Sequence, residues 1–248
     1  MAEDSRRPTF SEVFPSVYLF DTRDRRARTI EAVLREFLGP PRGRLLDIGS
    51  SSGAISYHMA GLFEQVVGVD VDDQALRFAA QRFKKTNLAF GLVDGTRLPF
   101  KDRQFDVVTC THIYEHVADP HKLLAEIRRV LKFGGACYFA AANRLWPIEF
   151  HYQLPFLAWL PPSMANRYLK LCGKGNLYDV RLLTLGSLRG LVEGFSVVDY
   201  TPRIVERPAA YHVEYMMLPG SLTHRLARLI LKYCYWLFPT YIWLLTRR

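Results

Sequence analysis

The segment 45–53, LLDIGSSSG, constrains the fold of this chain more than any other. Its apolar run is typical of a buried parallel strand. The glycines directly after it allow the backbone to turn tightly and to approach a ligand where a Cβ would collide. A second apolar run ends in Asp70, at the separation from Gly49 at which a carboxylate on the next strand can accept ribose hydroxyls. The pattern predicts a doubly wound α/β sheet that binds a nucleotide-like ligand.

A dinucleotide is the first alternative, because a glycine-rich turn followed by an acid is also the signature of NAD-binding sheets. Such a site uses the spacing GxGxxG, which brings a pyrophosphate to a helix N-terminus. This chain has GxSxG from Gly49 to Gly53, and Asp47 stands two residues before the first glycine, where an anion would repel a pyrophosphate. A carboxylate there suits a cation, and S-adenosylmethionine carries both an ammonium and a sulfonium group.

Further motifs follow in the segment 90–140. We expect a strand ending in Asp94, a strand over 105–110, a helix from about Pro120 to Leu131, a glycine turn and another strand. With these motifs in order, the chain closely resembles class I S-adenosylmethionine-dependent methyltransferases, in particular the type 11 group that includes the methyltransferases of ubiquinone and menaquinone biosynthesis. The resemblance covers roughly residues 44–143. It implies a Rossmann-like, mostly parallel sheet with a final antiparallel strand, and S-adenosylmethionine as the cofactor.

The resemblance also implies which residues hold the cofactor. These are Asp47, Gly49, Ser51, Gly53, Asp70, Val71, Asp94, Gly95, Thr111 and His112. Within this set Asp70 would hold the ribose, Asp94 would meet the adenine amino group, and His112 would lie beside the methyl. The family has a glycine where this chain has Ser51, and a serine fits there if its φ is negative.

Composition and charge narrow the class of protein. The chain has 248 residues, of which 49% are hydrophobic, so it can bury a full core in a single domain. Its four cysteines lack any CxxC spacing, which indicates buried thiols in a reducing compartment, and the first ten residues contain no apolar run that would predict a signal peptide. The net charge of +9 leaves nucleic acid, an anionic membrane or an acidic substrate as partners. We interpret the arginines at 23, 25, 26 and 28 as a solvated helix face.

The C-terminal segment 221–248 predicts an amphipathic helix. Arg225, Arg228 and Lys232 fall on one helical stripe, and leucines and isoleucine occupy the other faces. The stretch from Tyr233 to Thr246 has no charged residue and many aromatic ones. It is too short to span a bilayer, so we expect it to lie in the membrane interface. Truncation before Leu222 should then leave a cofactor-binding domain; a helix docked on that domain or on a dimer partner is the alternative.

An insertion of apolar residues at about 144–183 predicts a helical lid over the acceptor site. Its large side chains include Trp146, Phe150, Leu154, Phe156, Leu157, Trp159 and Leu160. They suit an apolar methyl acceptor, and they also suit a small subdomain with its own packing. After the lid the sheet resumes, and we expect the last, antiparallel strand within 202–217.

Catalytic candidates lie in two segments. Glu149 and His151 are two residues apart, so on an extended chain they face the same side and could form a histidine base oriented by a carboxylate. His112, Glu115 and His116 have the spacing of one helical turn and resemble the ExxEH pattern of ubiquinone-pathway O-methyltransferases, which use a divalent metal. Here His112 replaces the first acid, and relatives without metal also carry Glu115 and His116. We therefore expect His151, Glu149 and His112 to be catalytic, and no metal.

These observations favour a methyltransferase domain over residues 1–220 that acts at a membrane surface on a lipid, a lipid-linked sugar or a prenylated ring. The expected location is the cytoplasm, peripheral to the inner face of the membrane. Alternatives are a soluble methyltransferase of small molecules whose C-terminal helix makes a homodimer, and a scaffold protein without activity. A nucleic acid partner is not expected, because no RNA-binding module or NPPY-type tetrad is present.

Overall fold

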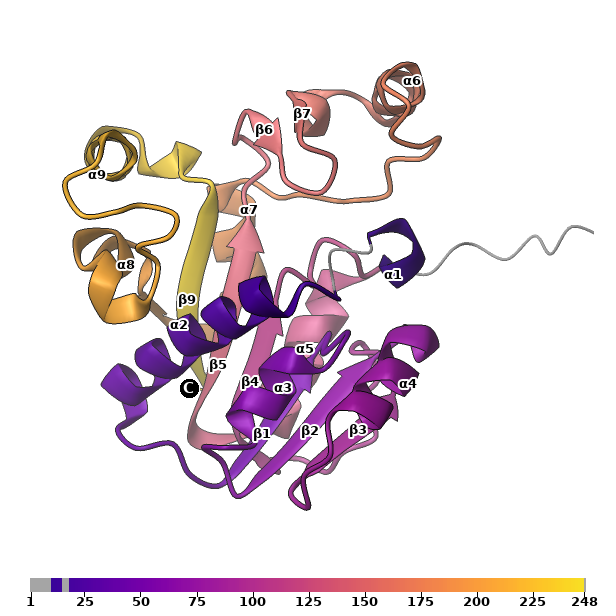
Figure 1. Ribbon diagram of the computed structural model, residues 1–248, viewed down its shortest axis with the longest axis vertical. Helices are drawn as coiled ribbons and strands as arrows, with labels where there is room; N and C mark the ends of the chain where they lie inside the picture. Colours follow the sequence, from indigo (N-terminus) through magenta and orange to yellow (C-terminus); the bar gives the residue numbers. More distant parts are fainter. Residues whose placement is uncertain (1–9, 15–17, 248) are drawn as a thin grey trace, which may run out of the picture.

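The computed structural model describes residues 10–14 and 18–247. The absence of a signal peptide was expected from the first ten residues, of which 1–9 lie outside the described part. A seven-stranded sheet crosses the middle of the molecule, with helices on both faces (Figure 1). Among the described residues, no helix combines the length and apolar character that a membrane span requires.

The sheet has the order β3-β2-β1-β4-β5-β9-β8. Its strands are β1 (Arg44–Ile48), β2 (Gln65–Asp70), β3 (Leu88–Leu92), β4 (Phe105–Thr111), β5 (Leu131–Ala142), β8 (Phe195–Asp199) and β9 (Thr240–Arg247). The first five pair in parallel, so their carboxyl ends meet at one edge. The order reverses beside β1, and the carboxyl ends on either side of that point form the crevice in which doubly wound sheets bind ligands. This confirms the predicted fold class.

The antiparallel strand is β9, which pairs with β5 on one side and β8 on the other. The expectation that 202–217 supplies this strand is wrong. That segment instead begins within α8 (Thr201–Glu206), continues through the 3₁₀ helix η3 (Pro208–Tyr211) and ends in turns. Pro202 and Pro208 are placed in the first turns of α8 and η3, where their missing N–H groups cost no hydrogen bond.

The expected C-terminal unit 221–248 is only partly helical. The amphipathic helix α9 (Leu222–Tyr233) forms as predicted and is followed by the 3₁₀ helix η4 (Tyr235–Leu237). The aromatic stretch that we expected in a membrane interface then becomes β9, in which Tyr241, Trp243 and Leu244 are buried in the sheet. Residues 221–247 are therefore part of the same sheet and core as the rest of the domain.

Helix starts follow local sequence. The helices not yet located are α1 (Phe10–Val13), α2 (Phe20–Leu38), α3 (Ala54–Met59), α4 (Asp73–Arg82), α5 (Pro120–Val130), α6 (Pro162–Leu171) and α7 (Leu185–Leu191). Asp72 caps α4 by accepting a hydrogen bond from the N–H of Ala75, and Asp119 caps α5 ahead of Pro120. These caps fix where each helix leaves the carboxyl edge of the sheet.

Two hydrophobic clusters cover the two faces of the sheet. Side chains of α2, α3 and α8, such as Ile30, Met59 and Ile204, pack on one face. Side chains of α5 and α7, with the inner face of α9, pack on the other. The insertion has a third cluster of its own, which includes Tyr152 and Leu169.

The insertion lies beyond the carboxyl ends of β4 and β5 (Figure 1). It contains the short hairpin of β6 (Ile148–Glu149) and β7 (Leu154–Pro155), the 3₁₀ helix η2 (Leu157–Trp159) and α6. Leu154 and Leu157 are buried within it, whereas Phe156 and Trp159 are exposed. The predicted lid is thus a small packed subdomain that also presents apolar side chains to solvent.

Candidate active site

The turn between β1 and α3 has glycines at positions where a side chain would not fit. Gly49 and Gly53 have φ values of +76° and +78°, and a Cβ on Gly49 would lie 2.0 Å from Cδ1 of Ile113. A Cβ on Gly53 would meet Ala79 at 2.7 Å. Ser51 also lies in the left-handed region, with φ +48°, so the condition of a negative φ is not met. This conformation costs a non-glycine residue about 1–2 kcal/mol, so other interactions of the loop must offset the cost.

Asp70 at the end of β2 stabilises the backbone conformation of Ser51. Its Oδ2 accepts a hydrogen bond from the N–H of Ser51 at 2.8 Å, and its Oδ1 accepts one from the N–H of Asp72 at 3.0 Å. Burial raises the pKa of Asp70, and these N–H donors oppose the rise. A carboxylate offers about four lone-pair sites, so two remain for ribose hydroxyls. Val71 beside it is 69% exposed, which leaves an apolar side chain at the tip of the strand.

Asp47 at the end of β1 has a different environment. Its Oδ2 accepts a hydrogen bond from the hydroxyl of Ser56 at 2.6 Å and its Oδ1 accepts one from that of Thr109 at 2.7 Å, which ties β1 to α3 and β4. Burial raises the pKa of Asp47, and both hydroxyl donors oppose this. Its influence on a cationic ligand is therefore electrostatic, added to a structural role.

Arg23 on α2 is a further candidate for the cofactor site that sequence reasoning missed. Burial and the neighbouring Arg26 lower its pKa to about 10, against the opposing effect of Asp47 and Asp70. Its guanidinium thus belongs to the electrostatic environment of the two cofactor acids, and it is a candidate for holding the carboxylate of a bound amino acid. The sequence of the four arginines between 23 and 28 does not distinguish Arg23, which is partly buried, from Arg25, Arg26 and Arg28, which are exposed as expected.

The other cofactor candidates lie at neighbouring strand ends. Asp94 follows β3, and its Oδ1 accepts hydrogen bonds from the N–H and hydroxyl of Thr96, both at 2.8 Å. Gly95 is packed so closely that a Cβ would lie 3.0 Å from Ile48 and Leu123. Thr111 ends β4. The candidates from β1 to β4 therefore share the carboxyl edge, although their contacts with a cofactor remain predictions.

The segment after β4 is a series of turns and not the start of a helix. His112 has φ +57°, and its Nδ1 lies 3.4 Å from Oε1 of Glu115. Glu115 is fully buried, and among the described residues neither of its carboxylate oxygens has a hydrogen-bond partner of good geometry. Burial raises the pKa of Glu115, but the rings of His112 and His116 lower it by more, so the net change is downward. An ionised carboxylate is thus buried beside two imidazoles.

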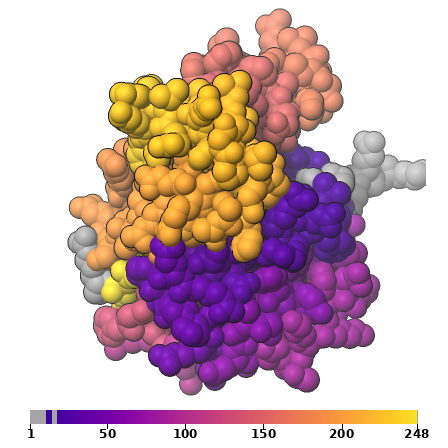
Figure 2. Space-filling model, turned by 60° about the vertical axis from the view of Figure 1, so that its left-hand side comes forward, coloured from indigo at the N-terminus to yellow at the C-terminus, as the bar shows by residue number. Residues whose placement is uncertain are grey.

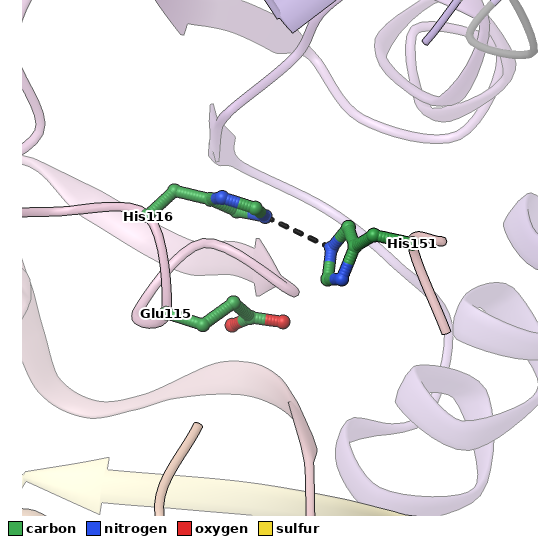
Figure 3. Close-up of side chains that lie close together, drawn as sticks. All are labelled: Glu115, His116 and His151. Atoms are coloured by element: carbon green, nitrogen blue, oxygen red, sulfur yellow. Dashed lines mark hydrogen bonds between the residues drawn. The ribbon is translucent and has the colours of Figure 1, made fainter. Parts of the chain in front are cut away.

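Glu149 and His151 from the insertion meet this segment. Glu149 is 1% exposed, and its Oε1 lies 2.7 Å from Nδ1 of His151, while its Oε2 accepts a hydrogen bond from the N–H of Tyr152. The Nε2 atoms of His151 and His116 lie 3.1 Å apart. Figure 3 shows the two rings side by side, with the Glu115 carboxylate below them. The expected pairing of Glu149 with His151 is present; the contact with His116 was not foreseen, because it joins segments far apart in sequence.

These positions divide the site into two parts. Cofactor candidates lie at the ends of β1 to β4. A cluster of histidines and glutamates forms where the turns after β4 meet Glu149 and His151 of the insertion. The N-terminal segment touches both. The N–H of Ser11 donates to Oδ2 of Asp72 at 2.8 Å, and the ring of Phe14 packs against that of His151. Such an arrangement suits the transfer of a group from a bound nucleoside to an acceptor beneath the insertion.

Comparison with known proteins identifies the chain as a methyltransferase. A family described as "Methyltransferase domain" matches residues 46–139. The ubiquinone/menaquinone biosynthesis C-methyltransferase of Desulfotalea psychrophila is 31% identical over 171 residues, which are 65% of this chain and 69% of that protein. A ubiquinone biosynthesis O-methyltransferase of Shewanella halifaxensis is 33% identical over 104 residues, 41% of this chain and 44% of that one.

A solved structure extends the likeness to nearly the whole fold. Phosphoethanolamine N-methyltransferase 2 of Haemonchus contortus, in complex with phosphomonomethylethanolamine and S-adenosylhomocysteine, aligns with a TM-score of 0.59 at 19% identity. The alignment covers 98% of this chain and 59% of that one. The three names describe methylation of carbon, oxygen and nitrogen, so the likeness does not select the acceptor atom.

Proposed function

Since the chain belongs to the class I S-adenosylmethionine-dependent methyltransferases, we propose that its acceptor is a lipid, a lipid-linked sugar or a prenylated ring, reached at a membrane surface. The methyl donor is S-adenosylmethionine. Its sulfonium is already activated, so the enzyme needs chiefly to hold a nucleophile in line with the methyl group. The names of the two sequence relatives place them in ubiquinone and menaquinone biosynthesis, which supports a prenylated ring among the acceptors.

The outer face of α9 carries this proposal. Leu222, Leu226, Leu229 and Tyr233 form one stripe along the helix and are 82%, 53%, 54% and 66% exposed. The neighbouring stripe consists of Arg225, Arg228 and Lys232, all exposed. A continuous apolar stripe facing water is unfavourable in a soluble surface, and beside basic residues it is typical of helices that lie on anionic membranes.

The inner face of α9 packs on the domain, which leaves the outer face turned to solvent. His224 is buried, its Nε2 lies 2.8 Å from the carbonyl oxygen of Val205, and the N–H of Gly220 donates to its Nδ1 at 3.0 Å. Ile230 and Leu231 pack against the core. These contacts fix the rotation of the helix and keep the leucine stripe outward.

The membrane-facing surface and the acceptor side of the site are neighbours. Figure 2 shows α9 and the segment after it next to the insertion, at one end of the molecule. The insertion adds exposed Phe156, Trp159, Met164 and Leu171 to that end. An acceptor with its tail in the bilayer would therefore have a short path to the cluster under the insertion. There, His151 oriented by Glu149 would act on the acceptor, with His112 beside the methyl group.

Vesicle flotation tests the proposal. The full-length protein should float with vesicles that contain anionic lipid, and binding should fall only partly in high salt, because screening weakens the charges but not apolar insertion. Replacing Arg225, Arg228 and Lys232 by Gln should lower affinity by about 100-fold, at about 1 kcal/mol per basic residue. The double variant Leu226→Ser/Leu229→Ser should abolish the salt-resistant part.

Leu92→Ser is the matched control, because Leu92 is 60% exposed but lies on β3, the far edge strand of the sheet. This variant should float like the wild type. If the wild type stays at the bottom of the gradient and sediments as a dimer that Leu226→Ser/Leu229→Ser dissociates, the stripe is a dimer interface and the membrane proposal is wrong.

A further inference from the structure

Three donor groups from two distant segments converge beneath the insertion. Glu115 and His116 come from the turns after β4 and His151 follows β6; one ligand atom from each lies within 4.8 Å of the other two. We propose that these residues bind a divalent metal ion of the first transition row, with Zn²⁺ as the best fit. The inference deepens the acceptor side of the proposed function and rests on it only for the role of the ion, not for its binding.

The spacing of the two imidazoles supports the proposal. Their Nε2 atoms are 3.1 Å apart, with the rings nearly perpendicular at 87°. Zn–N bonds of about 2.0–2.1 Å in tetrahedral geometry place two nitrogens about 3.3 Å apart, so the rings need to move by only a few tenths of an ångström. The sequence pattern grouped His112 with Glu115 and His116, but the structure puts His151 at this place.

Glu115 supplies an independent reason. It is fully buried, and neither of its oxygens has a hydrogen-bond partner within the part of the chain that the structure describes. The other buried carboxylates of the site, Asp47 and Glu149, each have two hydrogen bonds. The ring of His112 is the nearest partner, with Nδ1 3.4 Å from Oε1, so both oxygens keep acceptor sites without a hydrogen bond of good geometry. A bound cation would use these sites and offset the burial of the charge.

Glu149 occupies the position of an outer ligand partner. Its hydrogen bond with Nδ1 of His151 directs Nε2 of that ring toward the cluster, as carboxylates do for metal-binding histidines. Two nitrogens and one oxygen favour Zn²⁺ and its neighbours over Mg²⁺ and Ca²⁺, which prefer oxygen alone. Three protein ligands are typical of catalytic zinc sites, in which a fourth position is open to water or substrate.

A bound ion would bind an acceptor oxygen and lower its pKa. In that state Nε2 of His151 holds the ion, and Glu149 positions the ring. His151 would then act on the acceptor through the bound ion and not as a base, because neither of its ring nitrogens is left to accept a proton.

Cobalt titration tests the site directly. Full-length protein is stripped with a chelator and titrated with Co²⁺, whose visible absorption reports coordination by nitrogen and oxygen, and Zn²⁺ is then added in competition. One equivalent of Co²⁺ should bind and Zn²⁺ should displace it. His116→Ala and His151→Ala should remove the absorption, and Glu149→Gln should weaken binding by about 10–100-fold. His121→Ala is the matched control, because His121 is an exposed histidine on α5.

Binding of S-adenosylhomocysteine shows that each variant is folded, and it should be unchanged in all of them. Saturable Co²⁺ binding that persists in both His116→Ala and His151→Ala, or no binding by the wild type, would overturn the metal site. Neither result would affect vesicle flotation or cofactor binding, so failure of this inference and failure of the proposed function are distinguishable.

Discussion

At the scale of single residues, Ser51 has a strained backbone in the turn between β1 and α3, where we expect the cofactor to bind. Its left-handed backbone is held by the hydrogen bond from its N–H to Asp70. Replacing Ser51 by Gly should raise the free energy of unfolding by about 0.5–1 kcal/mol, because glycine adopts this φ without the Cβ penalty but loses more chain entropy. Denaturant unfolding measures the change. Ser50→Gly is the control: Ser50 has no such φ, so its variant should be destabilised. Equal destabilisation of both variants would contradict the account.

Asp70 should carry much of the cofactor affinity. Charge-assisted hydrogen bonds to ribose hydroxyls are each worth about 1.5–3 kcal/mol, so Asp70→Ala should weaken binding of S-adenosylmethionine by one to two decades. The variant also releases the N–H of Ser51, which loosens the loop. Calorimetric titration measures the affinity, with Asp73→Ala as the control, since Asp73 is exposed and pairs only locally with Arg77. Unchanged affinity in Asp70→Ala would remove the ribose assignment.

A site residue could be predicted from the sequence when its role depends on a short local motif, and not when it depends on tertiary contacts. Gly49, Gly53 and Asp70 act through backbone turns and strand ends, which a short motif specifies. Arg23 and the contact between His116 and His151 depend on tertiary packing. The residues next to Arg23 and His151 in the sequence do not indicate which distant residues these two side chains interact with.

At the scale of elements, Glu36 joins α2 to α8 and η3. The hydroxyl of Tyr211 donates to its Oε2 at 2.6 Å, and Arg203 and Arg207 donate at 2.9 and 3.1 Å. The hydrogen bond from Tyr211, helped by both arginines, lowers the pKa of Glu36 below its ordinary value of 4.5. The stabilisation is therefore present above about pH 4.5 and is lost as the pH falls through the lower pKa of the folded state.

Glu36→Gln should cost about 1 kcal/mol of stability at neutral pH, a modest figure because the carboxylate is 33% exposed. It should also flatten the loss of stability in acid. Unfolding curves between neutral and acidic pH measure both effects, with Glu64→Gln, an exposed glutamate, as the control. A variant with the same acid sensitivity as the wild type would show that this network does not couple the two elements.

Deletion of residues 222–248 should abolish folding, contrary to the expectation from sequence. The deletion removes β9 from between β5 and β8 and with it the four buried side chains of that strand, Tyr241, Trp243, Leu244 and Leu245. Their burial is worth about 6–12 kcal/mol, comparable to the whole stability of a domain. Circular dichroism and cofactor titration measure the outcome, and a truncated protein that binds S-adenosylmethionine would contradict it.

Strands could be predicted from the sequence where an apolar run is bounded by turn-forming residues. The strands from β1 to β5 follow that rule, and the caps at Asp72 and Asp119 mark the helices between them. β9 was missed because both of its faces are covered, so its aromatic run lacks the alternation of a half-buried strand and looks like an interfacial segment. Its Thr, Tyr, Ile and Trp residues favour a strand, and burial between β5 and β8 agrees with that propensity.

At the scale of the whole molecule, the proposed function places the methyl donor at the carboxyl edge of the sheet and the acceptor under the insertion, with the apolar stripe of α9 at the same end of the molecule. Under this proposal, position relative to the bilayer would be part of substrate selection, because an acceptor with a buried tail would be concentrated where the enzyme binds. A water-soluble acceptor would gain nothing from the exposed leucines.

Transfer of a labelled methyl group tests the central claim most directly. The protein is incubated with methyl-labelled S-adenosylmethionine and a cell extract that contains membranes, and the products are partitioned between organic and aqueous phases. We predict label in the organic phase, reduced by His151→Ala while cofactor affinity stays within about twofold, as expected for a group that acts on the acceptor. Label confined to the aqueous phase, with no organic product at any concentration of membrane, would contradict a lipid-like acceptor.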